Sequence, residues 1–204
     1  MTFAQIRNRF LFALLIITTS VGCDQTTKHL AQTNLPIYQM FSYFGDTVRL
    51  QYVLNTGAAF SLGATLPENV RWWIFVVGQG VFLLFLTLYL VKNHNLRRSQ
   101  FYGFALILGG GLGNFYDRIF RDGAVVDFLN IGIGDSLRTA IFNVADIAIT
   151  CGLVLLIVGI YRSEEHRKRE EASAAEHADE QNATELPDSP AQHTSESDPK
   201  TPSG

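Results

Sequence analysis

The chain has 204 residues, of which 47% are hydrophobic and 17% are charged, and its formal net charge is −3. The charges are divided unevenly: residues 163–204 hold eleven Asp or Glu against four Lys or Arg, whereas residues 1–162 hold eight against twelve. The two cysteines, Cys23 and Cys151, lie in or beside apolar segments, which argues against a disulfide framework or a zinc site. We therefore expect an apolar body, residues 1–162, followed by an acidic tail.

The first apolar segment, Phe10 to Gly22, has only the length of a signal-peptide core. Two arginines precede it and small residues lead to Cys23, as in a bacterial lipoprotein precursor that is cut before that cysteine. The other interpretation is a membrane helix that remains in the protein, because no Gly or Pro interrupts residues 23–31. Such a helix would carry Asp24 and Lys28 at its far end.

Three further apolar segments follow the first one along the chain. Because about 20 apolar residues cross the hydrocarbon as a helix, we predict four membrane spans, at about residues 8–30, 69–91, 100–119 and 142–161. Basic residues cluster before the first span, between the second and third, and after the fourth, and such clusters mark the cytoplasmic side. Both termini are therefore expected in the cytoplasm. If the first segment were removed by cleavage, the remaining basic clusters would still fall on the same side of the membrane. The distribution of charge alone therefore leaves both interpretations open.

Two longer connections lie on the opposite side in this arrangement. Every second residue from Val48 to Leu54 is apolar, which is typical of a strand with one buried face. The sequence Asn55-Thr-Gly57 then indicates a turn. We expect a small sheet over about residues 36–62, lying on the outer membrane surface. The second connection, Arg121 to Ile141, is expected to be short and irregular.

Several polar side chains stand at or near membrane depth, where ionisable groups normally face a protein interior or a wet cavity. They are Asn114, Asp117, Arg118, Asp127, Asn143 and Asp146. Asp127 and Asp146 both fall on the outer side and can therefore meet at one depth. Two neighbouring carboxyl groups share a proton, so that one acts as a base on water while the other protonates the substrate. This pair predicts peptide hydrolysis without a covalent intermediate.

Simpler roles are also open for these residues. The glycines between residues 109 and 113 would only allow close helix packing. Asp117 and Arg118 would form an interfacial ion pair, or Arg118 would meet lipid headgroups. Asp146 would stabilise a helix start, and Asp127 would belong to a turn or a cap. A proton-coupled channel would spread its charges through the membrane, whereas these gather at one end. None of the five histidines has metal-ligand spacing and no serine clearly pairs with a lysine, so we expect no metal and no cofactor.

Five short motifs occur in the order DQTTK (Asp24–Lys28), NTGAAFS (Asn55–Ser61), GGGLGNFYDR (Gly109–Arg118), VVDF (Val125–Phe128) and FNVAD (Phe142–Asp146). Together they resemble the lipoprotein signal peptidase family, also called signal peptidase II, over about residues 10–161. The resemblance implies an α-helical aspartic endopeptidase of the bacterial inner membrane, with four transmembrane helices and a small extracytoplasmic β-sheet. It implies diacylglyceryl-modified prolipoproteins as substrates, cut just before the lipidated cysteine. Membrane lipids are the other expected partners, with no nucleic acid, and we expect a monomer.

The resemblance also implies roles for single residues. Asp127 and Asp146 match the catalytic pair. The supporting set around the site is matched by Asp24, Lys28, Asn55, Gly57, Asn114, Arg118, Asn143 and Ala145. Two departures from the family pattern do not touch the catalytic pair: Leu54 replaces a basic residue, and no proline precedes FNVAD.

The resemblance favours one interpretation of the first segment. The family motif begins at Asp24, directly after Cys23, and Ser20 stands where a lipobox usually has Leu. Residues 8–30 are therefore expected to be the first span of an enzyme. Residues 163–204 lie outside the resemblance and contain no aromatic residue. They are expected to form an acidic, disordered cytoplasmic tail, because they cannot bury enough apolar surface to offset the entropy of ordering. A weak helix is expected to continue through SEEHRKREEASAAEH before it frays.

Overall fold

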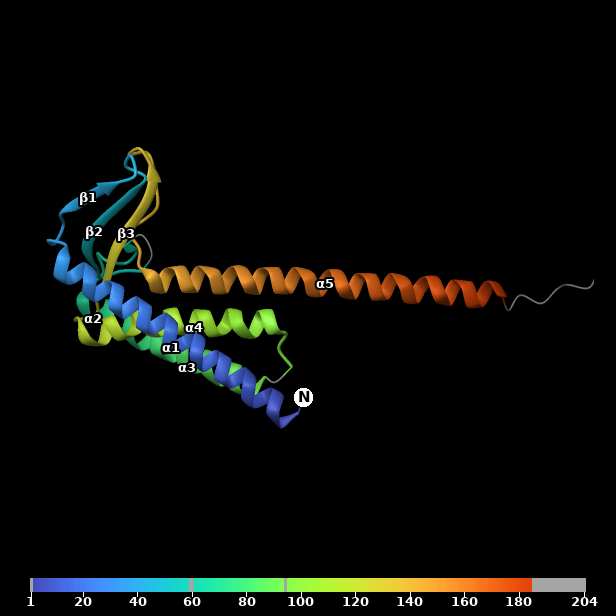
Figure 1. The fold of residues 1–204 in the computed structure, drawn as a ribbon. Coiled ribbons are helices and arrows are strands. Elements are labelled where there is room, and N and C mark those ends of the chain that lie inside the picture. Colours follow the sequence, from blue (N-terminus) through green and yellow to red (C-terminus); the bar gives the residue numbers. More distant parts are fainter. Residues whose placement is uncertain (1, 59–60, 94, 185–204) are drawn as a thin grey trace, which may run out of the picture. The chain divides into compact units, whose positions relative to one another are not determined.

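The computed structural model describes residues 2–58, 61–93 and 95–184. The chain divides into two compact units, Met1–Arg162 and Ser163–Gly204. In chain order the elements are α1 (Phe3–Asn34), β1 (Met40–Tyr43), β2 (Val48–Asn55), α2 (Glu68–Trp72), η2 (Trp73–Gly78), α3 (Gln79–Lys92), α4 (Arg98–Phe120), β3 (Val125–Ile133), β4 (Leu137–Arg138) and α5 (Val144–Thr184). Figure 1 shows the sheet at the end of the helices where α1 ends and α5 begins.

Three helical stretches among the described residues are long and apolar enough to cross a membrane: Ala4–Asn34, Glu68–Lys92 and Val144–Ser173. They confirm the apolar helices predicted for the first, second and fourth segments. The second stretch is continuous but contains one π-helical part, η2. The third predicted segment is also helical, as α4, but it carries polar groups at its second half and is not among these three.

Helix α4 packs at the centre of the helical layer. The apolar core joins α1, α3 and α4 through residues such as Ala13, Leu86 and Leu108. Glycines of α4 are buried and permit a close approach: a Cβ atom at Gly113 would lie 2.6 Å from a carboxylate oxygen of Asp24. The helix-packing role proposed for the glycine run is therefore confirmed, and the same close approach brings polar residues of α1 against α4.

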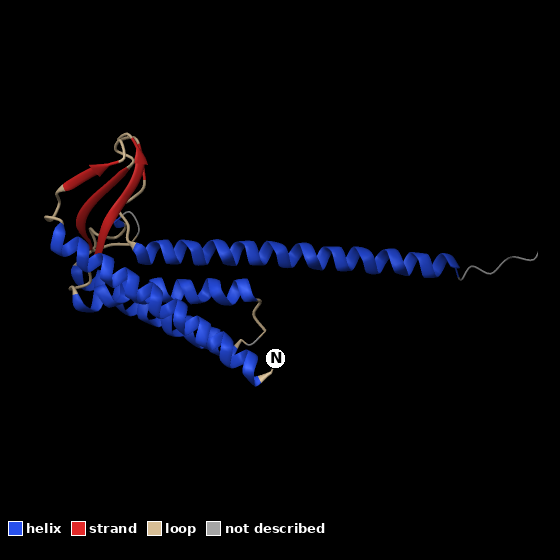
Figure 2. Cartoon of the chain, in the orientation of Figure 1, coloured by secondary structure: helices blue, strands red, loops and turns tan. Residues whose placement is uncertain are grey.

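The sheet is antiparallel, with the strand order β1-β2-β3-β4. Figure 2 shows these strands together at one end of the helices. The prediction of a sheet over residues 36–62 accounts for β1 and β2 only. The prediction that residues 121–141 are irregular is wrong, because β3 spans nine residues there and pairs with β2, including Val53 opposite Asp127. The glycines at 132 and 134 suggested a loop, but the pairing with β2 supplies the backbone hydrogen bonds of a strand.

The prediction of one buried face for β2 is also wrong. All eight residues of β2 are half-buried. The sheet is small and covers neither face of its inner strand completely, so alternation in the sequence does not become alternation in burial. The turn at residues 55–57 is confirmed, since the backbone N–H of Gly57 donates to Oδ1 of Asn55 at 2.9 Å.

Helix α5 continues to Thr184, further than the helical extension to His177 that the sequence predicts. Within residues 163–184, ion pairs one helical turn apart join Arg169 to Glu165 and Arg167 to Glu171, and such pairs support exposed helices. The remaining tail, residues 185–204, lies outside the described residues, so its disorder stays a prediction.

Candidate active site

Asp127 and Asp146 come from different elements and line one cavity. Asp127 lies in β3 and only 3% of its surface is exposed, whereas Asp146 is half-buried in the first turn of α5. Both border a cavity of about 560 Å³, together with Asn55, Asn114 and Arg118. The fold thus brings together the two carboxyl groups that the sequence singled out, although 19 positions separate them along the chain.

Three asparagine side chains hold these carboxyl groups. Asp127 accepts hydrogen bonds from Nδ2 of Asn143 at 2.7 Å and from Nδ2 of Asn55 at 2.9 Å. Asp146 accepts from Nδ2 of Asn114 at 2.9 Å and from the backbone N–H of Asn143 at 3.0 Å. Asn143 therefore contacts both carboxyl groups, and each of the four carboxylate oxygens has a donor of its own.

The protonation of Asp127 reflects its surroundings. Burial raises the pKa of Asp127 from its ordinary value to about 6, because a charged carboxylate loses its hydration in this position. The hydrogen bonds from Asn55 and Asn143 oppose this rise in pKa, while the nearby charge of Asp146 adds to it. A carboxyl group with such a pKa can hold and release a proton near neutral pH.

A lysine determines how the amide of Asn114 is turned. The Nζ atom of Lys28 donates to Oδ1 of Asn114 at 2.9 Å, and Nδ2 of Asn143 lies 3.1 Å from the same oxygen. An ammonium group only donates hydrogen bonds, so it selects the amide oxygen of Asn114. The Nδ2 end of the amide then faces Asp146. This contact links the catalytic candidates to residues of α1.

Lys28 belongs to a buried charge cluster, which we define as Asp24, Lys28 and Asp117. Its Nζ atom lies 2.8 Å from Asp24 and 3.0 Å from Asp117, and all three side chains are fully buried. Asp24 accepts from the backbone N–H of Ala145 at 2.9 Å, and Asp117 accepts from that of Val126 at 3.0 Å. The cluster therefore anchors the residues that directly precede Asp146 and Asp127.

Asp117 was missed as a supporting residue. The predicted ion pair between Asp117 and Arg118 is not what the structure contains, since Asp117 pairs with Lys28 and Arg121. Asp117 and Arg118 do not pair with each other because the side chains of consecutive helical residues point about 100° apart and do not face one another. The spacing of three residues from Asn114 to Asp117 was the available signal, because it places both side chains on one face of α4.

Arg118 contacts backbone carbonyls of two loops. Its guanidinium group donates to the carbonyl of Gly57 at 2.8 Å and to that of Gly123 at 2.9 Å, and it lies 5.1 Å from the centre of the Phe75 ring. Gly57 is required by close packing, as a Cβ atom there would lie 2.6 Å from the carbonyl oxygen of Leu62. Every residue of the predicted supporting set thus lies at or directly behind the cavity. Residues 59 and 60 of the NTGAAFS motif lie outside the described residues.

Comparisons with known proteins identify the family of this chain. The family model of signal peptidase (SPase) II matches residues 16–162. A lipoprotein signal peptidase of Francisella tularensis subsp. novicida is 40% identical over 151 residues, which cover 72% of this chain and 88% of the relative. One of Treponema denticola is 38% identical over 159 residues, covering 74% and 90%.

Solved structures give the same result. A bacterial membrane enzyme solved by the in meso method at 2.3 Å resolution is similar with a TM-score of 0.65 and 28% sequence identity, covering 76% of this chain and 90% of that structure. A second bacterial membrane enzyme, at 1.9 Å resolution, has a TM-score of 0.62. With a family match over most of the body and relatives of this identity, the chain belongs to the signal peptidase II family of aspartic-type signal peptidases.

Proposed function

We propose that this protein cleaves diacylglyceryl-modified prolipoproteins just before the lipidated cysteine, with Asp127 and Asp146 as its catalytic residues. The observation that carries the proposal is the bridge through Asn143, which contacts both carboxyl groups at one wall of the cavity. The apolar side chains of Ile141 and Ile147 line the same cavity. They offer a surface for the apolar residues and the lipid of a precursor.

In the proposed reaction the two carboxyl groups carry one proton between them. Because burial raises the pKa of Asp127, we assign the proton to Asp127 and the negative charge to Asp146. A water molecule gives a proton to Asp146 while the oxygen of that water attacks the scissile carbonyl carbon. At the same time Asp127 protonates the carbonyl oxygen. This forms a tetrahedral diol without a bond to the protein.

The diol then breaks down along the same proton path. Asp146 gives its proton to the amide nitrogen as the C–N bond breaks, and Asp127 recovers a proton from one of the two hydroxyl groups. The products are a signal peptide with a free carboxyl group and a mature chain that begins with the lipidated cysteine. The donors of Asn55, Asn114 and Asn143 keep both carboxyl groups in place throughout.

We also propose that α4 is the fourth membrane span. Its 23 residues extend about 35 Å, enough to cross the hydrocarbon, and its buried Asn114, Asp117 and Arg118 face protein instead of lipid. With four spans, both termini lie in the cytoplasm of a bacterium and the sheet lies at the outer face of the inner membrane, beside the catalytic pair. A monomer is sufficient, since one chain supplies the whole site.

The proposal is tested by comparing Asp127→Asn and Asp146→Asn with the wild-type chain in detergent or liposomes. The substrates are a diacylated precursor and its unlipidated form. Each variant is expected to lose turnover by a factor of about 100 or more, as for the removal of a general acid or base, while it still elutes as a folded protein. Asp135→Asn, an exposed carboxyl group between β3 and β4, is the control and keeps wild-type turnover. Processing by either catalytic variant at the wild-type rate, or equal cleavage of both substrates, contradicts the proposal.

A further inference from the structure

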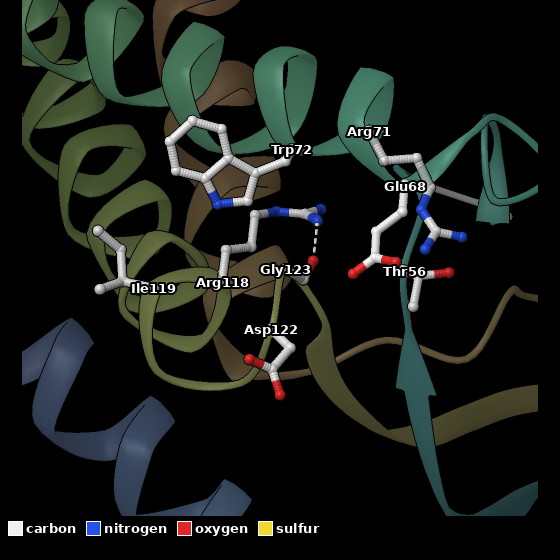
Figure 3. A pocket seen from close by; sticks show the side chains of 8 residues that line it. All are labelled: Thr56, Glu68, Arg71, Trp72, Arg118, Ile119, Asp122 and Gly123. Atoms are coloured by element: carbon white, nitrogen blue, oxygen red, sulfur yellow. Dashed lines mark hydrogen bonds between the residues drawn. The ribbon is translucent and has the colours of Figure 1, made fainter.

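A second, smaller cavity shares Arg118 with the cavity of the catalytic pair. Its volume is about 160 Å³. Figure 3 shows residues from the start of the second apolar stretch and from the end of α4 around it. The residues that matter for its chemistry are Glu68, Arg71, Trp72, Arg118, Ile119 and Asp122. We call it the headgroup pocket, for the reasons that follow.

The headgroup pocket stands at the end of two apolar helices. Glu68, Arg71 and Trp72 begin the apolar stretch Glu68–Lys92. Ile119 precedes the last residue of α4. Trp72 is 48% exposed and the adjacent Trp73 is 64% exposed. Exposed tryptophans at the end of a membrane span are typical of the depth at which lipid headgroups lie.

The charges around the pocket balance, but they do not pair with each other. Two guanidinium groups and two carboxyl groups line it, so its formal net charge is zero. In the described part of the chain, neither Glu68 nor Arg71 nor Asp122 takes part in an ion pair. Arg71 donates one hydrogen bond to the carbonyl of Ala64 at 2.8 Å, and the terminal nitrogens of Arg118 bind two backbone carbonyls. The pocket therefore offers both signs of charge to a ligand.

We propose that the headgroup pocket binds a zwitterionic phospholipid whose headgroup ends in a primary ammonium, of the phosphatidylethanolamine class. Its phosphate lies by Arg71 and Arg118, since guanidinium groups bind phosphate oxygens well. Its ammonium, which has three donors, lies between Glu68 and Asp122. The proposal rests on the proposed function only for the orientation of the helices in the membrane.

A ligand in this pocket is connected to the catalytic pair by a chain of hydrogen bonds that begins at Arg118. Arg118 holds the carbonyl of Gly57, the N–H of Gly57 binds Asn55, and Asn55 donates to Asp127. A phosphate beside Arg118 adds negative charge that keeps this guanidinium group in place. The lipid is thus a bound component of the enzyme that supports the loop at the site.

The test measures lipid retention and needs no turnover, so its failure is distinct from a failure of the proposed protease activity. The full chain in detergent receives phosphatidylethanolamine or phosphatidylcholine with identical acyl chains, and native mass spectrometry counts the retained lipid. The methyl groups of choline remove the ammonium donors while the charge remains. We expect the wild-type chain to retain phosphatidylethanolamine about fivefold better than phosphatidylcholine, because the loss of one net hydrogen bond weakens binding by about that factor.

Variants of the pocket separate the two ends of the headgroup. Glu68→Gln is expected to abolish the preference, and Asp122→Asn, at a residue whose positive φ of 50° suits Asn, to reduce it. Arg71→Gln weakens retention of both lipids. Arg98→Gln, at the start of α4, is the control and leaves the preference at about fivefold.

Three results overturn the proposal. Equal retention of the two lipids by the wild-type chain is the first, and an unchanged preference in both Glu68→Gln and Asp122→Asn is the second. The third is unchanged lipid retention in Glu68→Gln together with a loss, in the same variant, of binding of an uncleaved lipidated precursor, measured as a dissociation constant. In that case the pocket holds the precursor peptide and not a lipid.

Discussion

Two charge clusters in the body of this protein have the same chemistry at different depths. The buried charge cluster lies between α1 and α4 and consists of Asp24, Lys28 and Asp117. A surface charge cluster joins the turn between β1 and β2 to the turn between β3 and β4, and consists of Asp46, Arg49, Asp135 and Arg138. The distances between opposite charges are equally short in both, 2.8 to 3.0 Å in the first and 2.5 to 3.4 Å in the second.

Solvent makes these two clusters unequal. Water screens an exposed pair, so that it adds little to stability. A buried charge that loses its partner has no water to replace it. The buried charge cluster also holds backbone N–H groups next to both catalytic candidates, whereas the surface charge cluster ties two turns of the sheet. The burial of the charged side chains, and not the number of ion pairs, therefore decides which of the two clusters the site depends on.

The largest expected effect comes from Lys28→Met. This change leaves Asp24 buried without its cation and Asp117 with Arg121 alone, and it removes one of the two donors to Oδ1 of Asn114. We expect Tm to fall by about 10 °C or more, as for a broken buried ion pair, and turnover of a lipidated precursor to disappear. Thermal unfolding in detergent measures the first effect. Arg49→Met removes a cation from the surface charge cluster and serves as its counterpart: equal losses of Tm in the two variants would show that depth does not matter.

Titration of Asp127 is expected to have the next largest effect. Its pKa in the folded protein, about 6, exceeds its ordinary value of 3.8, so the stability that it contributes is fully present below pH 3.8 and is lost as the pH rises through about 6. Tm of the wild-type chain should therefore fall by about 6 °C relative to that of Asp127→Asn over this range. Parallel curves of Tm against pH for the two proteins would contradict it.

The link between the buried charge cluster and Asp146 is tested by Asn114→Leu. The variant keeps the ion pairs of Lys28 but removes the donor to Asp146. We expect turnover to fall about 100-fold, as for the loss of one preorganised donor at a reaction centre, with a decrease in Tm of about 4 °C. If turnover falls only in proportion to the folded fraction, the link has no catalytic role.

The smallest effect is expected from Arg49→Met. The hydrogen bonds from Arg49 hold the pKa of Asp46 well below its usual range, so this pair stabilises the protein above the ordinary pKa of Asp46 and is lost as the pH falls. That direction is opposite to the one expected for Asp127. We expect a decrease in Tm of no more than about 2 °C at neutral pH, smaller still in high salt, with turnover unchanged. A large loss of turnover would mean that the sheet turns support the site.

Much of the helical architecture could be predicted from the sequence, because a membrane-spanning helix satisfies its own backbone and needs only a long apolar run. The second apolar stretch, expected over about residues 69–91 and found at Glu68–Lys92, follows from this rule. The continuity of α1 past Cys23 was expected for another reason, because no Gly or Pro interrupts residues 23–31. Strand β3 did not follow, because its hydrogen bonds depend on β2, which is 70 positions away at the pair Asn55 and Val125. The Val, Phe and Ile residues of this segment suit a strand, but the glycines at 132 and 134 pointed to a loop, and the partner strand cannot be read from local sequence.

The sequence by itself determined which side chains are available for chemistry. Asp127, Asp146, Asn114 and Asn143 stood out because polar groups are costly near membrane depth, and the family resemblance added Asn55 and Lys28. Only the tertiary structure decided how they act together. It paired Asp117 with Lys28 instead of Arg118, turned the amide of Asn114 toward Asp146, and placed Arg118 between two cavities. Hydrogen-bond direction and burial arise from contacts between distant segments, so neither can be read from the order of residues.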